Sequence, residues 1–123
     1  MDNEPQEIAE RAFNFAIQIV RLSQVLGKEH GISRLLINQL LRAATSIGAN
    51  LEESKGAQSR PDYLSKVSIA CKEARETHYW LRLFVATTLV PETLLEQLRD
   101  EANQLVAILT TIVKKLKMHK KSE

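Results

Sequence analysis

The sequence contains few of the residues that interrupt helices, with four glycines and three prolines in 123 residues. Glycine and proline form most tight turns and end most helices, so their scarcity argues against a fold of many short strands. Leucine, alanine, isoleucine, glutamate, lysine, arginine and glutamine dominate instead, and these residues favour long helices. With 44% apolar residues, the composition is that of a globular protein, and we expect one domain covering residues 1–123.

Cysteine and long apolar runs are also scarce. The single cysteine, Cys71, cannot form an internal disulfide, which suits a reducing compartment. The longest run without charge, residues 102–113, is too short to span a bilayer. Residues 1–10 are acidic and lack the basic and apolar regions of a signal peptide. We therefore expect a cytoplasmic protein with no membrane segment.

Motifs that carry chemistry are missing as well. The sequence has no Glu-x-x-His motif, no glycine-rich phosphate loop and no dinucleotide fingerprint. Its histidines, His30, His78 and His119, lie far apart and have no partners at ligand spacing. His78 and Cys71 fall on an apolar helix face, where we interpret both as core residues. We expect a protein that is not an enzyme and holds neither metal nor cofactor.

Four stretches have the apolar spacing of amphipathic helices, at about 7–27, 33–56, 61–88 and 91–118. Ser33 is a predicted N-cap, and Ser59 with Asp62 has the spacing of a capping box, with Pro61 in the first turn. The predicted seams are Ile8, Ala12, Phe15, Ile19, Leu22 and Leu26; Ile37, Leu40, Ala44, Ile47 and Leu51; Leu64, Val67, Cys71, Ala74, His78, Leu81 and Val85; and Leu95, Leu98, Ala102, Leu105, Leu109, Ile112 and Leu116.

Short connections make successive helices antiparallel neighbours, and alternating steps of three and four indicate left-handed packing. The sequence therefore predicts an up-down-up-down antiparallel four-helix bundle, left-handed. Gly48 lies within the second helix, one turn from Ala44. Because a helical glycine costs about 1 kcal/mol relative to alanine, we expect another helix backbone to pass close to it.

Several apolar residues lie outside these seams, including aromatic residues of the kind enriched at interfaces. We interpret this excess as a second buried face and hence as self-association; the alternative is a wider core with a few exposed apolar groups. The candidate oligomer interface comprises Phe13, Leu36, Leu41, Tyr79, Trp80, Leu83 and Phe84.

Polar residues recur one turn apart on the second and third helices. Antiparallel packing would let Arg42 pair with Glu73 or Glu76, in a network that also includes Asn50 and Glu53. The structural interpretation is a network that fixes the register of the two helices. The functional alternative is a polar groove for a ligand, and we prefer the structural interpretation because charges on a helix flank are usually solvated or paired.

Basic residues gather on the third helix and at the C-terminus. Residues 114–123 carry five lysines and one glutamate. Such clusters attract phosphates without regard to sequence, although lysines at a helix C-terminus also complement the helix dipole and aid solubility. The candidate nucleic-acid contacts are Arg60, Lys66, Lys72, Arg75, Arg82, Lys114, Lys115, Lys117, Lys120 and Lys121.

The stretch from residue 40 to residue 83 carries a dispersed pattern: Arg42, Ala43 and Ala44, Ser46 and Ile47, Asn50, Glu53, Ser59, Tyr63, Ala70, Glu73 and Glu76. In this pattern the chain resembles the bacterial four-helix-bundle family named for 23S rRNA intervening-sequence proteins. The resemblance implies a homopentamer with a central channel in the bacterial cytoplasm. Related accessory proteins of diversity-generating retroelements are strongly basic pentamers that bind nucleic acid and a reverse transcriptase, whereas this chain is nearly balanced in charge.

Two functions follow as expectations. The first is a non-catalytic homo-oligomer, a pentamer by resemblance, that binds RNA or DNA through its basic surfaces. The second is a protein-interaction scaffold or accessory subunit that binds another protein and no nucleic acid. The basic clusters favour the first, and the excess apolar surface together with the near-neutral charge favours the second.

Overall fold

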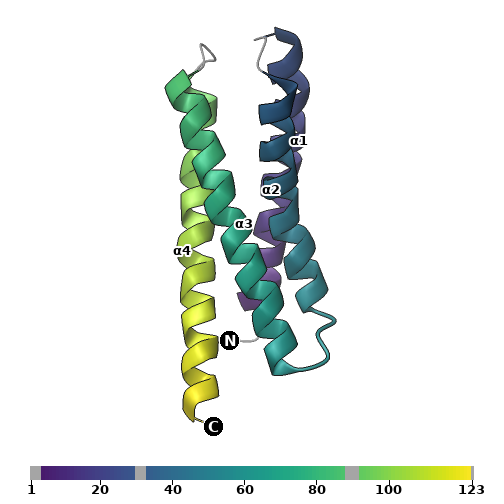
Figure 1. Ribbon diagram of the computed structural model, residues 1–123, viewed down its shortest axis with the longest axis vertical. Coiled ribbons are helices and arrows are strands. Elements are labelled where there is room, and N and C mark those ends of the chain that lie inside the picture. Colours follow the sequence, from purple (N-terminus) through teal and green to yellow (C-terminus); the bar gives the residue numbers. More distant parts are fainter. Residues whose placement is uncertain (1–3, 30–32, 88–91, 123) are drawn as a thin grey trace.

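The computed structural model describes residues 4–29, 33–87 and 92–122, and these residues form helices and no strands. The helices are α1 (Glu4–Glu29), α2 (Arg34–Ser54), α3 (Arg60–Thr87) and α4 (Glu92–Ser122). Successive helices lie side by side and alternate in direction, and α4 returns beside α1 (Figure 1). The predicted all-α bundle is confirmed, with α1 and α4 longer than expected. The handedness of the packing stays a prediction.

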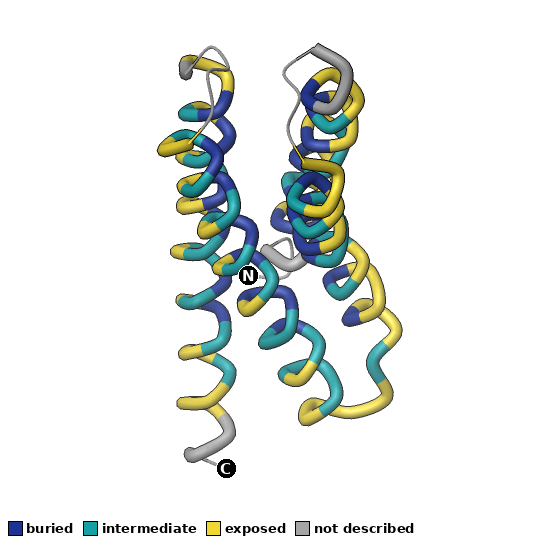
Figure 2. Tube along the Cα trace, turned by 45° about the horizontal axis from the view of Figure 1, so that its top comes forward, coloured by how far each residue is buried: buried dark blue, intermediate teal, exposed yellow. Residues whose placement is uncertain are grey.

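The core follows the predicted seams of α1, α2 and α4. Buried positions lie on the sides of the helices that face one another, and exposed positions lie on the outer sides (Figure 2). On α4, the seam residues from Leu95 to Ile112 are all buried, and Leu116 alone is half-buried. Leucines spaced at three and four residues therefore predicted this face of the core correctly.

The predicted seam of α3 is correct at Val67, Cys71, Ala74 and Leu81 and wrong at Leu64, His78 and Val85. Thr77 and Phe84 are buried, whereas His78 and Val85 are half-buried. Thr77 is fully buried, and its hydroxyl donates to the Glu73 carbonyl at 2.8 Å, so the polar group is satisfied within its own helix. Phe84 is fully buried in the core, so its assignment to the oligomer interface is also wrong.

The helix starts agree only in part with the predicted caps. Ser59 accepts a hydrogen bond from the Asp62 amide at 3.1 Å, as a capping box requires, but the Asp62 carboxylate accepts from the Gln58 amide instead of the Ser59 amide. Ser33 occupies the N-cap position of α2 without a side-chain cap hydrogen bond. Its carbonyl accepts from the Ile37 amide, so the backbone alone starts that helix.

Gly48 faces α1, as its place within a helix led us to expect. A Cβ atom at this position would lie 3.8 Å from the backbone carbon, the carbonyl oxygen and the Cβ atom of Ala12. This separation is ordinary van der Waals contact. The helices are therefore close, but there is room for one methyl group between them.

Candidate nucleic-acid interface

A groove of about 330 Å³ lies between α3 and α4. The two helices diverge toward the end of the bundle where α4 terminates (Figure 1). Each helix contributes four side chains to the groove: Ser68, Cys71, Lys72 and Arg75 from α3, and Thr110, Val113, Lys114 and Lys117 from α4.

Helical periodicity explains why these residues share one groove. Ser68, Lys72 and Arg75 follow one another at steps of four and three, so they lie on a single face of α3 beside the buried Cys71. The groove residues of α4 run from Thr110 to Lys117, a stretch as long as that from Ser68 to Arg75 on α3. The wall that each helix forms therefore has an apolar residue, Cys71 or Val113, next to the core and charged side chains at its solvent edge.

Thr110 joins the two walls. Its Oγ1 atom accepts a hydrogen bond of 3.2 Å from Nη2 of Arg75 and lies 3.5 Å from the Cys71 Sγ atom. A guanidinium has five N–H donors, so one bond to Thr110 fixes the position of Arg75 and leaves most of its donors for another partner.

The groove carries four cations and no carboxylate. Within the described ranges, none of Lys72, Arg75, Lys114 and Lys117 forms an ion pair. The two cations on each helix are also three residues apart, which places like charges side by side at a cost of about 0.2–0.5 kcal/mol per pair. An anion in the groove would relieve this repulsion.

Several cations outside the groove are paired with carboxylates. Lys66, a candidate nucleic-acid contact, lies 3.0 Å from Glu53, and this hydrogen bond, with the charge of Glu53, raises the pKa of the lysine. Arg11 of α1 contacts Glu101 of α4 at 2.7 Å, and the same two effects raise its pKa against the opposing effect of burial. These pairs leave less positive charge for an external anion than the groove cations do.

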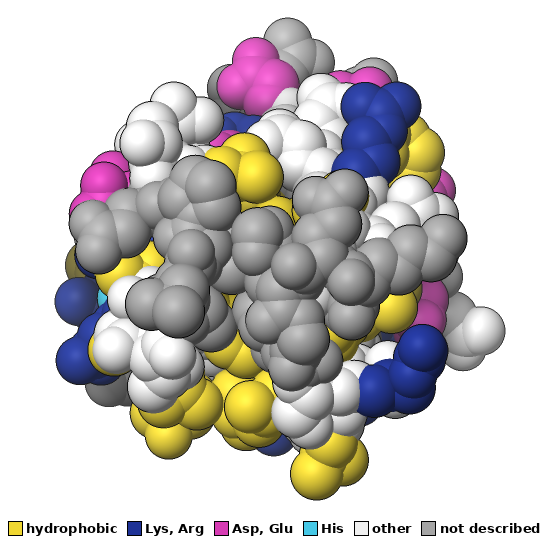
Figure 3. Space-filling view, turned by 90° about the horizontal axis from the view of Figure 1, so that it is seen from above, with side chains coloured by type: hydrophobic (Ala, Val, Ile, Leu, Met, Phe, Trp, Pro, Cys, Tyr) yellow, Lys and Arg dark blue, Asp and Glu magenta, His cyan; other side chains and the backbone are white. Residues whose placement is uncertain are grey.

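The remaining basic candidates do not join the groove. Arg60, Arg82 and Lys115 are exposed on α3 and α4 but do not line it. The side chains of Lys120 and Lys121 lie outside the described residues. At the end of the bundle seen in Figure 3, basic and acidic side chains are interspersed around the visible rim, with hydrophobic side chains between them. The groove is therefore the site where the predicted basic residues of both helices meet.

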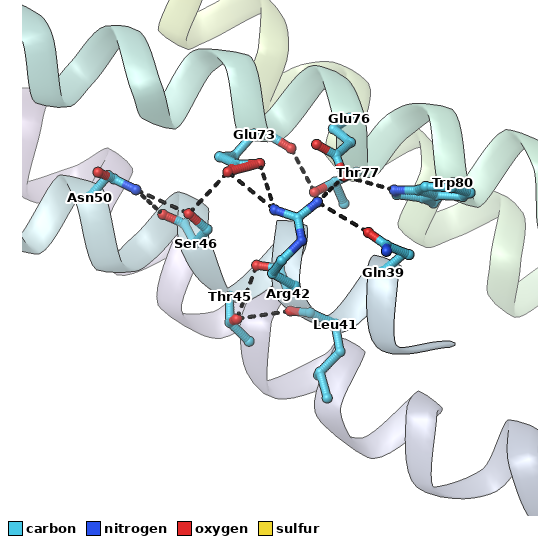
Figure 4. A network of polar contacts seen from close by, with 10 residues as sticks. All are labelled: Gln39, Leu41, Arg42, Thr45, Ser46, Asn50, Glu73, Glu76, Thr77 and Trp80. Carbon is cyan, nitrogen blue, oxygen red and sulfur yellow. Dashed lines mark hydrogen bonds and ion pairs between the residues drawn. The ribbon is translucent and has the colours of Figure 1, made fainter. Parts of the chain in front are cut away.

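The polar network lies between α2 and α3 (Figure 4). Arg42 contacts Glu76 and lies 3.4 Å from a carboxylate oxygen of Glu73. Trp80 donates its indole N–H to Glu76 at 3.0 Å. Ser46 donates to Glu73 at 3.4 Å. One guanidinium thus joins two carboxylates of the facing helix, a geometry that favours the register interpretation.

The predicted members of this network do not all meet. Asn50 reaches it through Ser46, to whose hydroxyl and carbonyl it donates at 3.0 and 2.9 Å. Glu53 is not part of it and pairs with Lys66 instead. The Asn50 contacts lie within α2, and the Glu53–Lys66 pair joins α2 to α3. Position 42 of α2 faces position 76 of α3, and position 53 faces position 66, so the two helices are antiparallel.

His78 lies where α3 faces α4. Burial lowers the pKa of His78, the positive charges of Arg82 and Arg99 lower it further, and Asp100 partly opposes them. The neutral imidazole is therefore favoured in the folded protein. Among the described residues, no group of three His, Cys, Asp or Glu side chains could hold a metal ion.

The apolar candidates divide into exposed and packed residues. Phe13 and Tyr79 are 60% and 53% exposed, and the Tyr79 ring meets the Trp80 ring edge to face. Leu36, Leu41 and Trp80 pack against the core, and Leu83 is half-buried. Among the described residues, five more large apolar side chains are exposed by 39–70% and were not candidates: Val20, Val25, Leu35, Leu94 and Met118. The surface thus keeps separate apolar side chains on α1, α2, α3 and α4.

Sequence reasoning also missed the uncharged residues of the groove and the Arg11–Glu101 pair. The missing information was the axial alignment of α4 with its neighbours. Arg11 and Glu101 are 90 residues apart, and neither carries a local motif that points to the other. Within the described part of the chain, no helix combines the length and apolarity that crossing a bilayer requires.

The comparisons with known proteins agree with this architecture. The family described as 23S rRNA-intervening sequence protein matches residues 4–111, which leaves Lys114 and Lys117 outside the match. The chain is similar to a crystal structure of a protein of unknown function from the S23 ribosomal protein family of Bacteroides thetaiotaomicron VPI-5482. The two share 35% sequence identity with a TM-score of 0.83, over 90% of this chain and 98% of the other. None of the curated proteins matches. The chain belongs to the 23S rRNA-intervening sequence protein family.

Proposed function

We propose that this protein is a non-catalytic, cytoplasmic homo-oligomer that binds nucleic acid through the groove between α3 and α4. The observation that supports this function is the set of four cations around the groove, which face no carboxylate within it and form no ion pair in the described part of the chain. A polyanion is the natural partner of such a surface because binding releases the counterions condensed on its phosphates.

The chemistry of the groove suits phosphate contacts more than base contacts. Lysine acts as a point charge toward phosphate, and Arg75 offers a planar fork for two phosphate oxygens. Serine and threonine hydroxyls, here Ser68 and Thr110, commonly bind phosphate oxygens or sugars. Contacts of these kinds position a nucleic acid without reading its sequence.

Self-association supports the same function. Exposed Phe13 and Tyr79 offer apolar surface for contact between copies. Several copies would bring several grooves to one nucleic acid and raise the overall affinity without any new contact. A homopentamer is the assembly that the family resemblance implies, and sedimentation of the purified protein measures it directly.

The test is fluorescence anisotropy with a labelled structured RNA and a DNA of matching sequence, over a salt series. We expect binding that weakens as salt increases and that falls in the Lys114→Gln/Lys117→Gln protein. The matched control is Arg21→Gln/Arg34→Gln, which removes two exposed charges from α1 and α2, away from the groove. Equal losses in both proteins would contradict a role for the groove.

The second candidate function is a scaffold for another protein, which the exposed apolar residues of α1 and α3 support. Affinity capture from a nuclease-treated bacterial lysate distinguishes the two functions. Retention of one specific protein, lost in a Phe13→Ser/Tyr79→Ser variant, supports the scaffold. Retention of nothing but the protein itself counts against it.

A further inference from the structure

We propose that the groove between α3 and α4 seats the sugar-phosphate backbone of a single strand, without regard to base, and does not accommodate a duplex. This inference rests on the proposed function and specifies its ligand. It follows from the length of the groove, its small volume between two helices and the chemistry of its walls.

The groove has the length of a few nucleotides. Ser68 to Arg75 on α3 and Thr110 to Lys117 on α4 each span seven residues, or about 10 Å along a helix axis at about 1.5 Å per residue. Phosphates follow one another by about 3.4 Å along the axis of one strand in B-DNA and by more in an extended strand. Two or three successive phosphates therefore match the length over which the four cations are placed.

The small size of the groove favours a flexible strand. It holds about 330 Å³ over a length of about 10 Å between α3 and α4, which is room for a few phosphate and sugar groups of one strand and not for the width of a duplex. A duplex is stiff over about 150 base pairs and carries its phosphates on a wide convex surface, so it cannot bend into a cleft of this length. Only one wall or the outer rim would then reach its phosphates. A single strand can enter and place phosphates between both walls.

The chemistry of the groove predicts indifference to base. Base-independent single-strand proteins combine a positive groove with aromatic rings on which bases stack. The side chains that line this groove in the described structure are hydroxyl, thiol, cationic and valine side chains, with no aromatic ring among them. Affinity then depends on charge, sugar and phosphate contacts, and bases stay outside the groove.

The experiment compares short labelled strands of poly(U), poly(A) and poly(dT) with a blunt RNA duplex of the same length, using the full-length protein. We expect the three single strands to bind with affinities within about threefold of one another. We expect the duplex to bind at least about tenfold more weakly, a difference of about 1.4 kcal/mol. The Lys114→Gln/Lys117→Gln protein should lose single-strand binding and keep its circular dichroism spectrum.

The outcomes separate this inference from the function on which it rests. A duplex that binds as tightly as the single strands, with loss in the groove variant, overturns the single-strand inference and leaves nucleic-acid binding in place. Strong preference for one homopolymer overturns the indifference to base. Failure of every nucleic acid to bind, or unchanged binding by the groove variant, overturns the proposed function itself.

Cys71 provides a second readout within the groove. It is the only cysteine of the chain, it lines the groove and it is 9% exposed. We expect saturating single strand to slow the reaction of this thiol with a maleimide, and the duplex to leave the rate unchanged. The Cys71→Ser protein, which should not label, is the control. An unchanged rate with single strand bound would place the strand elsewhere and overturn the inference.

Discussion

Replacing Gly48 by alanine should stabilise the protein. The glycine lies within α2, where alanine is favoured by about 1 kcal/mol because it restricts the unfolded chain and shields the helix backbone. The added Cβ atom would meet the backbone and Cβ of Ala12 at 3.8 Å, an ordinary contact distance that adds attraction and no overlap. We therefore expect the free energy of unfolding to rise by about 1 kcal/mol and the melting temperature by about 3–6 °C.

The assay is urea and thermal unfolding followed by circular dichroism, at one protein concentration because self-association also contributes to stability. Ala49→Gly is the matched control, since Ala49 is exposed on the same helix and its replacement should cost about 1 kcal/mol. A larger side chain, Gly48→Leu, should destabilise by about 1–3 kcal/mol because it must displace α1. If Gly48→Ala destabilises the protein while Ala49→Gly behaves as expected, α1 packs closer to α2 than described.

Three further predictions concern the core, the polar network and pH. Phe84→Ala should lower the free energy of unfolding by about 3–5 kcal/mol in denaturant titrations, because the ring is fully buried. Phe13→Ala, measured on the monomer, should change it by no more than about 0.5 kcal/mol because that ring is exposed. Similar losses would contradict the placement of Phe84. Arg42→Ala should lower the free energy of unfolding by about 1–2 kcal/mol in the same titration, because Glu73, whose side chain is 15% exposed, loses its cation. The loss is not larger because the Arg42 side chain is itself half exposed. No loss would refute the interhelical clamp. The pKa of His78 is lowered in the folded protein, so the unfolded state binds a proton at this histidine more readily. The free energy of unfolding should therefore be highest above pH 6.5, the ordinary pKa of histidine, and should fall as the pH drops below that value. His78→Gln should flatten the pH dependence of stability in that range, and an unchanged curve would contradict it.

The core could be predicted from the sequence where leucine, isoleucine and alanine occupy the seam, as on α4. On α3 the spacing allowed two choices, because steps of three and four lead from Ala74 to either Thr77 or His78, and from Leu81 to either Phe84 or Val85. Hydropathy did not decide between them. The Thr77 hydroxyl can be buried at little cost because it donates to the Glu73 carbonyl of its own helix, a contact that spacing does not reveal.

The basic residues of the candidate interface were predictable as residue types, but their grouping was not. Whether Lys72 and Arg75 meet Lys114 and Lys117 depends on how α4 is aligned along α3, and periodicity fixes the face of a helix without fixing its axial position. The alignment of α3 along α2 likewise places Lys66 beside Glu53, so that one predicted nucleic-acid contact is part of an ion pair.

The central claim is that the four groove cations bind phosphates, and the salt dependence of single-strand binding tests it most directly. Each phosphate contact with a single strand contributes about −0.7 to the slope of log affinity against log salt, so the two or three phosphates that fill one groove predict a slope of about −1.4 to −2.1. In Lys114→Gln/Lys117→Gln, which removes two of the four groove cations, the slope should fall to about half of that value, while Arg21→Gln/Arg34→Gln should keep the original value. Absence of binding at low salt, or equal slopes in the wild-type and groove-variant proteins, would contradict the proposed interface.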